Sequence, residues 1–226
     1  MKKRAGFYVL AAVLMAGCAG MPFKPVKFSR VDALEPKSVL ENFKKRLPEQ
    51  FEIIESVVFK YRRREISALG YTRVDEKEKT FATAGLTPMG VKVFELKATG
   101  NKLESSFTLP SEVEKKINRE KMAQAMTGDF HRVYFDRIPG VNAAVTKTKD
   151  RIYFREPSGD GILESVFGGP DKALVQKRFL KEGREIWKVR YFEYRLKNSK
   201  IYPGGIFYEN RRGKYKITLR LKEITA

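Results

Sequence analysis

Residues 214–222 read KYKITLRLK, and apolar and polar side chains alternate along this stretch without a break. Successive side chains of a β-strand point to opposite faces of a sheet, so Tyr215, Ile217, Leu219 and Leu221 would lie on one face. The lysines, the threonine and the arginine between them would lie on the other. The stretch therefore predicts a strand with one face against apolar material and the other in water.

The same alternation recurs along most of the chain. Turn signals such as GLTPMG at 85–90 and TGNK at 99–102 separate the alternating segments. We expect strands at about 50–62, 64–76, 79–87, 91–98, 102–109, 150–156, 161–167, 171–181, 184–196 and 213–224. The connections among the first five are too short for a crossover helix, so neighbouring strands should pair antiparallel.

Two helices interrupt these strands. The first opens at Pro36 and stops at Pro48. Its apolar face would consist of Val39, Leu40, Phe43 and Leu47. The second begins at residues 111–114 (SEVE), a capping box, and runs to about residue 127. Residues 128–148 should be irregular apart from a helical turn near 130–135. The predicted fold class is α+β, with a curled antiparallel sheet of about ten to eleven strands.

Residues 1–17 have the order of an export signal. A basic block at residues 2–4 precedes the apolar run FYVLAAVLM at 7–15, and two small residues follow. The apolar run is too short for a membrane-spanning helix. Cys18 comes next and is the only cysteine in the sequence, so it cannot form an internal disulfide. One alternative is an ordinary secretory signal with an incidental cysteine.

Met-Ala-Gly-Cys at 15–18 resembles the lipobox of bacterial lipoproteins. The resemblance implies cleavage before Cys18 and lipid attachment to that residue, and two or more acyl chains make a stable anchor. Ala19 replaces the aspartate that retains lipoproteins at the inner membrane, which implies the bacterial outer membrane, facing the periplasm. Residues 18–36 contain three prolines and would form a flexible tether. Residues 37–226 would form a single domain.

The chain is strongly basic, with a formal net charge of +19. Removal of residues 1–17 would take away three basic residues and no acidic one. For an exported protein the expected partners of such a charge are anionic lipid head groups or lipopolysaccharide, and we expect no nucleic acid. The alternative is a solvated surface that keeps the protein soluble.

Residues that could build a catalytic or metal site are scarce. His131 is the only histidine, and no G-x-S-x-G motif occurs. The Gly168-Gly169 and Gly204-Gly205 pairs are typical of turns rather than of phosphate-binding loops. We therefore expect no catalytic residue, no metal and no cofactor, which disfavours a hydrolase acting on envelope material and favours a binding protein.

Three short motifs carry a resemblance to a known family. They are TPMGVKVFEL at 87–96, IWKVRY at 186–191 and YPGGI at 202–206, which leads into the last strand. The pattern is similar to the LolA/LolB superfamily of lipoprotein carriers and outer-membrane receptors, and most of all to LolB-like lipoproteins of unassigned function. The resemblance implies an unclosed half barrel whose concave apolar face is covered by helices.

Ten apolar side chains could line that concave face. They are Phe94, Leu96, Leu103, Phe107, Trp187, Val189, Tyr191, Ile217, Leu219 and Leu221. An acyl chain costs about 0.8 kcal/mol per CH₂ when exposed to water, so it leaves a bilayer only for an apolar cavity. The implied function is binding of a lipid, glycolipid or lipoprotein for transfer or insertion at the outer membrane. The alternative is an ordinary packed core in an accessory lipoprotein that holds an envelope protein partner.

The turn at 85–90 carries two apolar side chains, Leu86 and Met89. In the family, the residue that protrudes from this turn is implicated in delivering cargo to the membrane, and here that position is Met89. We expect Leu86 and Met89 to contact outer-membrane lipids. The alternative is an ordinary hairpin turn. The expected partners are these lipids, the acylated cargo and a periplasmic carrier or envelope protein.

Overall fold

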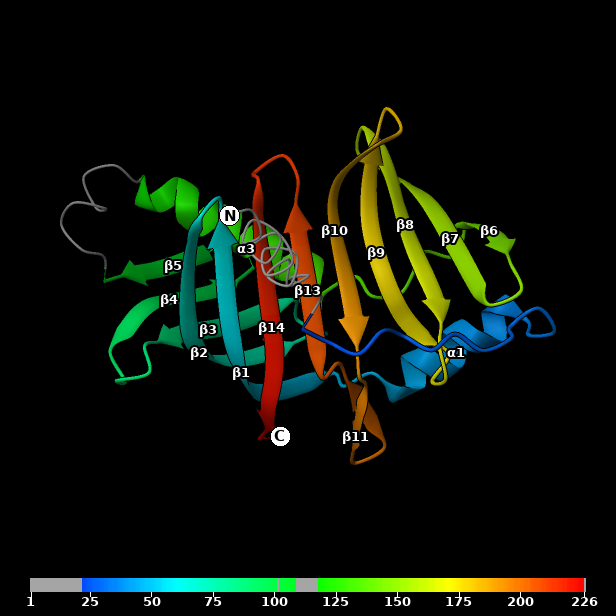
Figure 1. Cartoon of the computed structure of the whole chain (residues 1–226), viewed down its shortest axis with the longest axis horizontal. Coiled ribbons are helices and arrows are strands. Elements are labelled where there is room, and N and C mark those ends of the chain that lie inside the picture. Colours follow the sequence, from blue (N-terminus) through cyan, green and yellow to red (C-terminus); the bar gives the residue numbers. More distant parts are fainter. Residues whose placement is uncertain (1–21, 101, 109–117, 226) are drawn as a thin grey trace, which may run out of the picture.

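The computed structural model describes residues 22–100, 102–108 and 118–225. The signal segment, Cys18 and the predicted helix start at Ser111 lie outside the described residues. A large curved sheet dominates the molecule, and two helices lie against it (Figure 1). Among the described residues, no helix is long and apolar enough to cross a membrane.

The elements follow one another in a strand-rich order. They are α1 (Pro36–Arg46), β1 (Gln50–Tyr61), β2 (Arg64–Asp75), β3 (Thr80–Leu86), β4 (Lys92–Thr99), β5 (Lys102–Phe107), α3 (Arg119–Tyr134), β6 (Ala144–Lys147), β7 (Arg151–Ser158), β8 (Gly161–Gly168), β9 (Ala173–Lys181), β10 (Arg184–Phe192), β11 (Arg195–Lys197), β12 (Lys200–Tyr202), β13 (Gly205–Asn210) and β14 (Tyr215–Ile224).

Twelve strands form one sheet in the order β5-β4-β3-β2-β1-β14-β13-β10-β9-β8-β7-β6. Every neighbouring pair is antiparallel, and β1 pairs with β14 through a register that places Val57 opposite Leu219. The end strands β5 and β6 do not pair with each other, so the barrel is unclosed. β11 and β12 form a separate two-stranded sheet. The predicted α+β half barrel is confirmed, with twelve strands in its main sheet rather than ten to eleven.

Two strand predictions were wrong in the C-terminal half. The strand expected at 184–196 ends at Phe192, because Glu193 adopts a positive φ of 53° and turns the chain. The strand β13 was missed because apolar and polar side chains do not alternate along it. Its Ile206 faces the main core, while Phe207 belongs to a second apolar cluster on the opposite side of the sheet. A strand covered on both faces loses the period of two on which strand prediction depends.

The prediction for residues 128–148 was right in part, because the helical turn expected near 130–135 is present as the end of α3, but the remaining residues are not all irregular. The helix α3 continues to Tyr134, and β6 follows at 144–147. The N-terminal cap of α3 is Asn118, whose side chain accepts a hydrogen bond from the backbone N–H of Lys121 at 2.9 Å. Tertiary packing extends the helix, because its last turns bury Val133 and Tyr134 against the sheet.

The helices cover the concave face. The expected apolar face of α1 is confirmed, since Phe43 is fully buried and meets the ring of Phe167 edge-on at 5.2 Å between centroids. On α3, Phe130 stacks on Phe81 of β3 at 3.9 Å between centroids. The main hydrophobic core lies between these helices and the sheet.

Residues 22–28, within the expected tether, lie along the convex face of the sheet (Figure 1), whereas Val31 and Leu34 reach the main core. Phe23 stacks on Phe192 at 5.1 Å between ring centroids and packs against Phe207. A Cβ atom at Gly205 would lie 2.3 Å from the Phe23 ring, so glycine is needed beneath it. Further along, the backbone N–H of Val31 donates to the carbonyl of Lys149 at 2.9 Å. This part of the chain therefore packs on the sheet.

Polar contacts hold α3 on the concave face. Asp129 accepts hydrogen bonds from the hydroxyls of Tyr208, at 2.6 Å, and Tyr215. The hydroxyl of Tyr134 donates to the carboxyl of Glu55 on β1 at 2.6 Å. Burial raises the pKa of Glu55 to about 7, although the hydrogen bond from Tyr134 acts in the opposite direction. Glu55 therefore holds its proton far more tightly in the folded protein than in the unfolded chain.

We predict that Glu55 makes stability depend on pH. Its contribution is fully present below about pH 4.5 and is lost as the pH rises to about 7, because the folded state binds the proton that the unfolded chain releases. In wild-type protein the free energy of unfolding should fall by on the order of 3 kcal/mol across that range, and E55Q should lack this fall. Urea unfolding at several pH values measures this. E65Q, at an exposed position of β2, is the control and should keep the wild-type slope. An unchanged slope in E55Q would contradict the assignment.

Candidate functional site

The ten residues expected on the concave face come together in one hydrophobic cluster. Seven are buried, namely Leu96, Phe107, Trp187, Val189, Tyr191, Leu219 and Leu221. Phe94, Leu103 and Ile217 are partly buried and pack against the same cluster. They come from β4, β5, β10 and β14, which lie in both halves of the sheet. That these residues contact a ligand stays a prediction.

The interior beneath the helices is closed in this conformation. A cleft on the concave face, between β1, β14 and the loop after α3, has a free volume of about 10 Å³. Its lining consists of Phe51, Ile53, Glu55, Tyr134, Arg137, Tyr202, Pro203, Ile206, Leu219 and Leu221. Such a volume holds about one water molecule. An acyl chain could enter this cleft only after the elements that cover it move.

A larger and more open hollow lies between β5 and the start of α3. Its volume is about 620 Å³, and the predicted cavity residues Leu103 and Phe107 contribute to its wall. Ser105 and Ser106 of β5 and Gln124 of α3 also line it, so the wall is partly polar. Two of the ten predicted residues thus border open space, while Leu219 and Leu221 border the narrow cleft.

Sequence reasoning missed the buried charged residues of the interior. Glu55 and Lys177 stand at positions of β1 and β9 where the alternation would place an apolar side chain. Glu55 follows Phe51 and Ile53 on the same face of β1, and Lys177 precedes Phe179 on β9. A charged residue in the apolar phase of an alternating strand is a signal that could have identified both. Arg137 lies in the loop after α3, where no period exists.

Lys177 and Arg137 bring two positive charges into the interior. Lys177 is 2% exposed and donates from Nζ to the carbonyl of Phe135 at 2.8 Å. Burial lowers its pKa to about 8. Arg137 is 3% exposed, and the ring centroid of Phe51 lies 5.9 Å from its Cζ atom. The interior is therefore not uniformly apolar, because it contains two buried cations.

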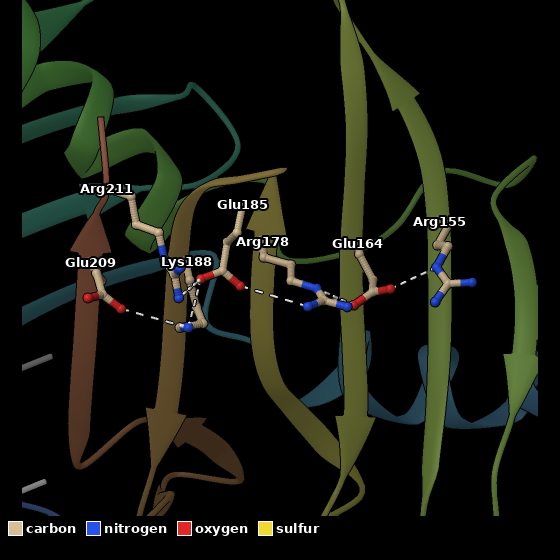
Figure 2. A network of polar contacts seen from close by, with 7 residues as sticks. All are labelled: Arg155, Glu164, Arg178, Glu185, Lys188, Glu209 and Arg211. Carbon is tan, nitrogen blue, oxygen red and sulfur yellow. Dashed lines mark hydrogen bonds and ion pairs between the residues drawn. The ribbon is translucent and has the colours of Figure 1, made fainter. Parts of the chain in front are cut away.

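Charges on the convex face form a row of ion pairs across the strands (Figure 2). Glu164 of β8 has no exposed side-chain surface and accepts from Nε of Arg155 at 2.7 Å and of Arg178 at 2.6 Å. Burial raises the pKa of Glu164, but the hydrogen bonds from Arg178 and Arg155 outweigh it and leave the pKa lowered.

The row continues on the next strands. Glu185 pairs with Lys188 at 2.8 Å and with Arg211 at 3.0 Å, and Lys188 also approaches Glu209 at 3.7 Å. Four basic residues are thus paired on the convex face, which agrees with the alternative of a solvated surface.

One end of the sheet is rich in basic hairpins. Tyr61 pairs with Tyr215, so the β1–β2 hairpin at 62–63 and the β13–β14 hairpin at 211–214 lie next to each other. Their exposed basic residues are Arg62, Arg63, Arg64, Arg211, Arg212 and Lys214, of which Arg211 joins the ion-pair row. This end could meet an anionic surface.

The two residues of the expected membrane-contact loop occupy different environments. Met89 is 89% exposed at the tip of the β3–β4 turn. Gly90 follows with a φ of 80°, and its N–H donates to the carbonyl of Thr87 at 2.9 Å, which shapes the turn. Leu86 ends β3 opposite Leu69 and is half-buried. Only Met89 therefore protrudes in this conformation.

His131 lies on α3 among aromatic rings. It meets the ring of Phe81 edge-on at 5.9 Å and that of Phe135 at 4.7 Å between centroids. Burial lowers its pKa. Among the described residues, no group of three His, Cys, Asp or Glu side chains is placed to hold a metal ion. His131 therefore acts as a packing residue in this arrangement.

The fold is similar to that of several solved proteins. A LolA superfamily protein from Nitrosomonas europaea matches with a TM-score of 0.54 and 13% identity, covering 85% of this chain and 93% of that one. A domain from Vibrio parahaemolyticus assigned to outer-membrane lipoprotein sorting has a TM-score of 0.51 and 10% identity, covering 83% and 90%. A DUF1329 family protein from Desulfovibrio piger has a TM-score of 0.53 and 8% identity, covering 83% and 91%.

These identities are low enough that the likeness concerns the fold alone. The LolA-like half barrel is confirmed, and the similarity does not single out LolB. No curated protein matches the chain. A family model described as "Protein of unknown function (DUF3261)" matches residues 55–223, which span β1 to β14 and with them the whole large sheet. The chain therefore belongs to the DUF3261 family.

Proposed function

We propose that this protein is a lipoprotein anchored through Cys18 to the periplasmic face of the bacterial outer membrane. It binds the acyl chains of a lipid, glycolipid or lipoprotein in its concave interior, for transfer or insertion at that membrane, and it performs no covalent catalysis. The observation that carries the proposal is the gathering of ten apolar side chains into one cluster on the concave face of an unclosed sheet. The LolA-like fold supports it.

The covering elements are suited to opening. The sheet keeps its own backbone hydrogen bonds whether or not α3 lies on it, because α3 is not part of any ladder. Side-chain hydrogen bonds such as Tyr208–Asp129 and Tyr134–Glu55 hold the helix, and these polar groups can form hydrogen bonds with water when the helix moves away. A chain that enters would replace the aromatic contacts that now fill the interior, such as Phe81–Phe130.

The proposed membrane side combines an apolar tip with basic hairpins. Met89 would enter the inner leaflet of the outer membrane, and the basic hairpins at 62–63 and 211–214 would meet anionic head groups. By the register of β1 to β4, the turn at 87–91 lies at the same end of the strands as these hairpins.

A second candidate function rests on the closed cleft. An interior with room for about one water is also what an accessory lipoprotein with a packed core would have. Such a protein would hold an envelope protein partner on its surface instead of carrying lipid.

We predict that lipid purifies with the protein. The full chain with C18S lacks the proposed attachment thiol, so any lipid extracted from it comes from non-covalent binding. Mass spectrometry should find acylated molecules in near-stoichiometric amount. L219W fills the interior at a buried position and should lower the yield of lipid severalfold. L196W adds the same ring at the exposed Leu196 and should leave the yield unchanged. A lipid-free protein with a tightly bound protein partner would favour the accessory function.

We predict that M89E weakens membrane association. A carboxylate at an exposed apolar tip cannot enter the lipid and is repelled by anionic head groups, so binding should fall about tenfold. Flotation of the C18S chain with liposomes that contain anionic lipid measures the change. V141E places the same charge at a fully exposed apolar position elsewhere and should bind as before. If M89E binds and transfers lipid like the parent protein, the turn has no role at the membrane.

A further inference from the structure

The guanidinium of Arg137 is buried without a hydrogen-bond partner. Its Nε and Nη2 atoms are buried, and neither makes a hydrogen bond within the described part of the chain. The ring of Phe51 lies beside the group, 5.9 Å from Cζ to the centroid. Nε and Nη2 lie on the same edge of the guanidinium and donate in parallel, which is the geometry that binds the two oxygens of a carboxylate.

The groups around Arg137 do not neutralise it. Its charge lowers the pKa of four buried tyrosines, although burial raises each of them overall; these are Tyr134, Tyr191, Tyr194 and Tyr202. Lys177 is a second cation close enough for the two charges to act on each other. The carboxyl of Glu55 lines the same cleft, but the Tyr134 hydroxyl engages it. Asp136 and Glu76 act on Lys177, and Glu76 and Asp136 both pair with Lys79.

A buried cation without a counter-ion is costly. Removing the partner of a buried charge destabilises proteins strongly, and an apolar side chain of similar volume is often better tolerated. Arg137 therefore does not serve the fold in the way that the ion pairs of the convex face do. Proteins commonly keep a residue that lowers their stability where that residue serves binding.

We propose that Arg137 binds the carboxylate of a single-chain amphiphile of the fatty-acid class, with the chain lying on the apolar wall of the same cleft. This deepens the proposed function and rests on it. The wall next to Arg137 includes Phe51, Leu219 and Leu221, so the charged head and the apolar tail both find complementary surfaces. The free volume of the cleft holds about one water, which suits a carboxylate head group better than a larger phosphate.

The chain would be admitted past Tyr202. This residue lies on β12, which pairs only with β11 and not with the large sheet. Its ring meets Phe51 edge-on at 5.9 Å between centroids and so covers the cleft. Movement of the β11–β12 hairpin would uncover Phe51 and Arg137 without breaking a ladder of the twelve-stranded sheet.

Binding of a fatty acid and of the fatty alcohol with the same chain tests this proposal. The C18S chain, freed of bound lipid, should bind the acid about tenfold more tightly than the alcohol, as a charge-assisted hydrogen-bond pair predicts. R137M should bind the two ligands equally. R190M is the matched control, because Arg190 also has a buried Nε without a partner but lies on the convex face beside Phe207. It should keep the preference for the acid.

The outcomes distinguish a failure of the proposed lipid-binding function from a failure of the role assigned to Arg137. If neither ligand binds, the proposed function itself fails. If both bind but the parent protein shows no preference, or R137M keeps the preference, the role of Arg137 is wrong. A lysophosphatidic acid that binds more tightly than the fatty acid would also overturn the assignment to a carboxylate.

Thermal unfolding provides a second measurement. Without ligand, R137M should melt at a higher temperature than the parent protein, because it removes an uncompensated buried charge. The fatty acid should raise the melting temperature of the parent protein and of R190M, but raise that of R137M no more than the alcohol does. A lower melting temperature for ligand-free R137M would show that Arg137 serves the fold, and the proposal would fall.

Discussion

The pairing of β1 with β14 holds the two halves of the large sheet together. It joins the half of the sheet that runs from β5 to β1 to the half that runs from β14 to β6. The two strands stand at opposite ends of the folded body in sequence, yet they align from Ile53 opposite Ile224 to Tyr61 opposite Tyr215. Without this seam the chain would form two separate meanders, and neither would have a concave face large enough to enclose a core.

The seam also locates the candidate site. Phe51 and Ile53 from β1 and Leu219 and Leu221 from β14 form the wall of the cleft into which Arg137 projects. Strand pairing supplies this wall, and it does not depend on the helices. The helices and the β11–β12 hairpin supply the cover. A rigid wall with a separable cover is what a reversible lipid binder needs, because the cover can move while the sheet keeps its hydrogen bonds.

The two faces of the sheet differ in how their most deeply buried charges are paired. On the convex face, Glu164 is buried but has two arginine partners, and the ion pairs extend over neighbouring strands. On the concave face, Lys177 has one backbone acceptor and Arg137 has no hydrogen bond from the described residues. Paired charges on the convex face are explained by the fold. The partnerless edge of Arg137 on the concave face is not explained by the fold, and the proposal assigns a ligand carboxylate to it.

Strand character and the face of most side chains could be predicted from the sequence, because alternation is a local property. The strand at 214–222 followed from this alternation, and the helix between Pro36 and Pro48 followed from the helical spacing of its apolar residues. The common face of the ten apolar residues followed from alternation within each strand together with the family resemblance. The tertiary structure decided what local pattern cannot encode. β13 lacks a period because both of its faces are covered, and α3 extends to Tyr134 because its last turns find a surface to bury. The pairing of β1 with β14 and the isolation of Arg137 arise from contacts between residues far apart in the chain, and alternation specifies a face but not the partner that will cover it.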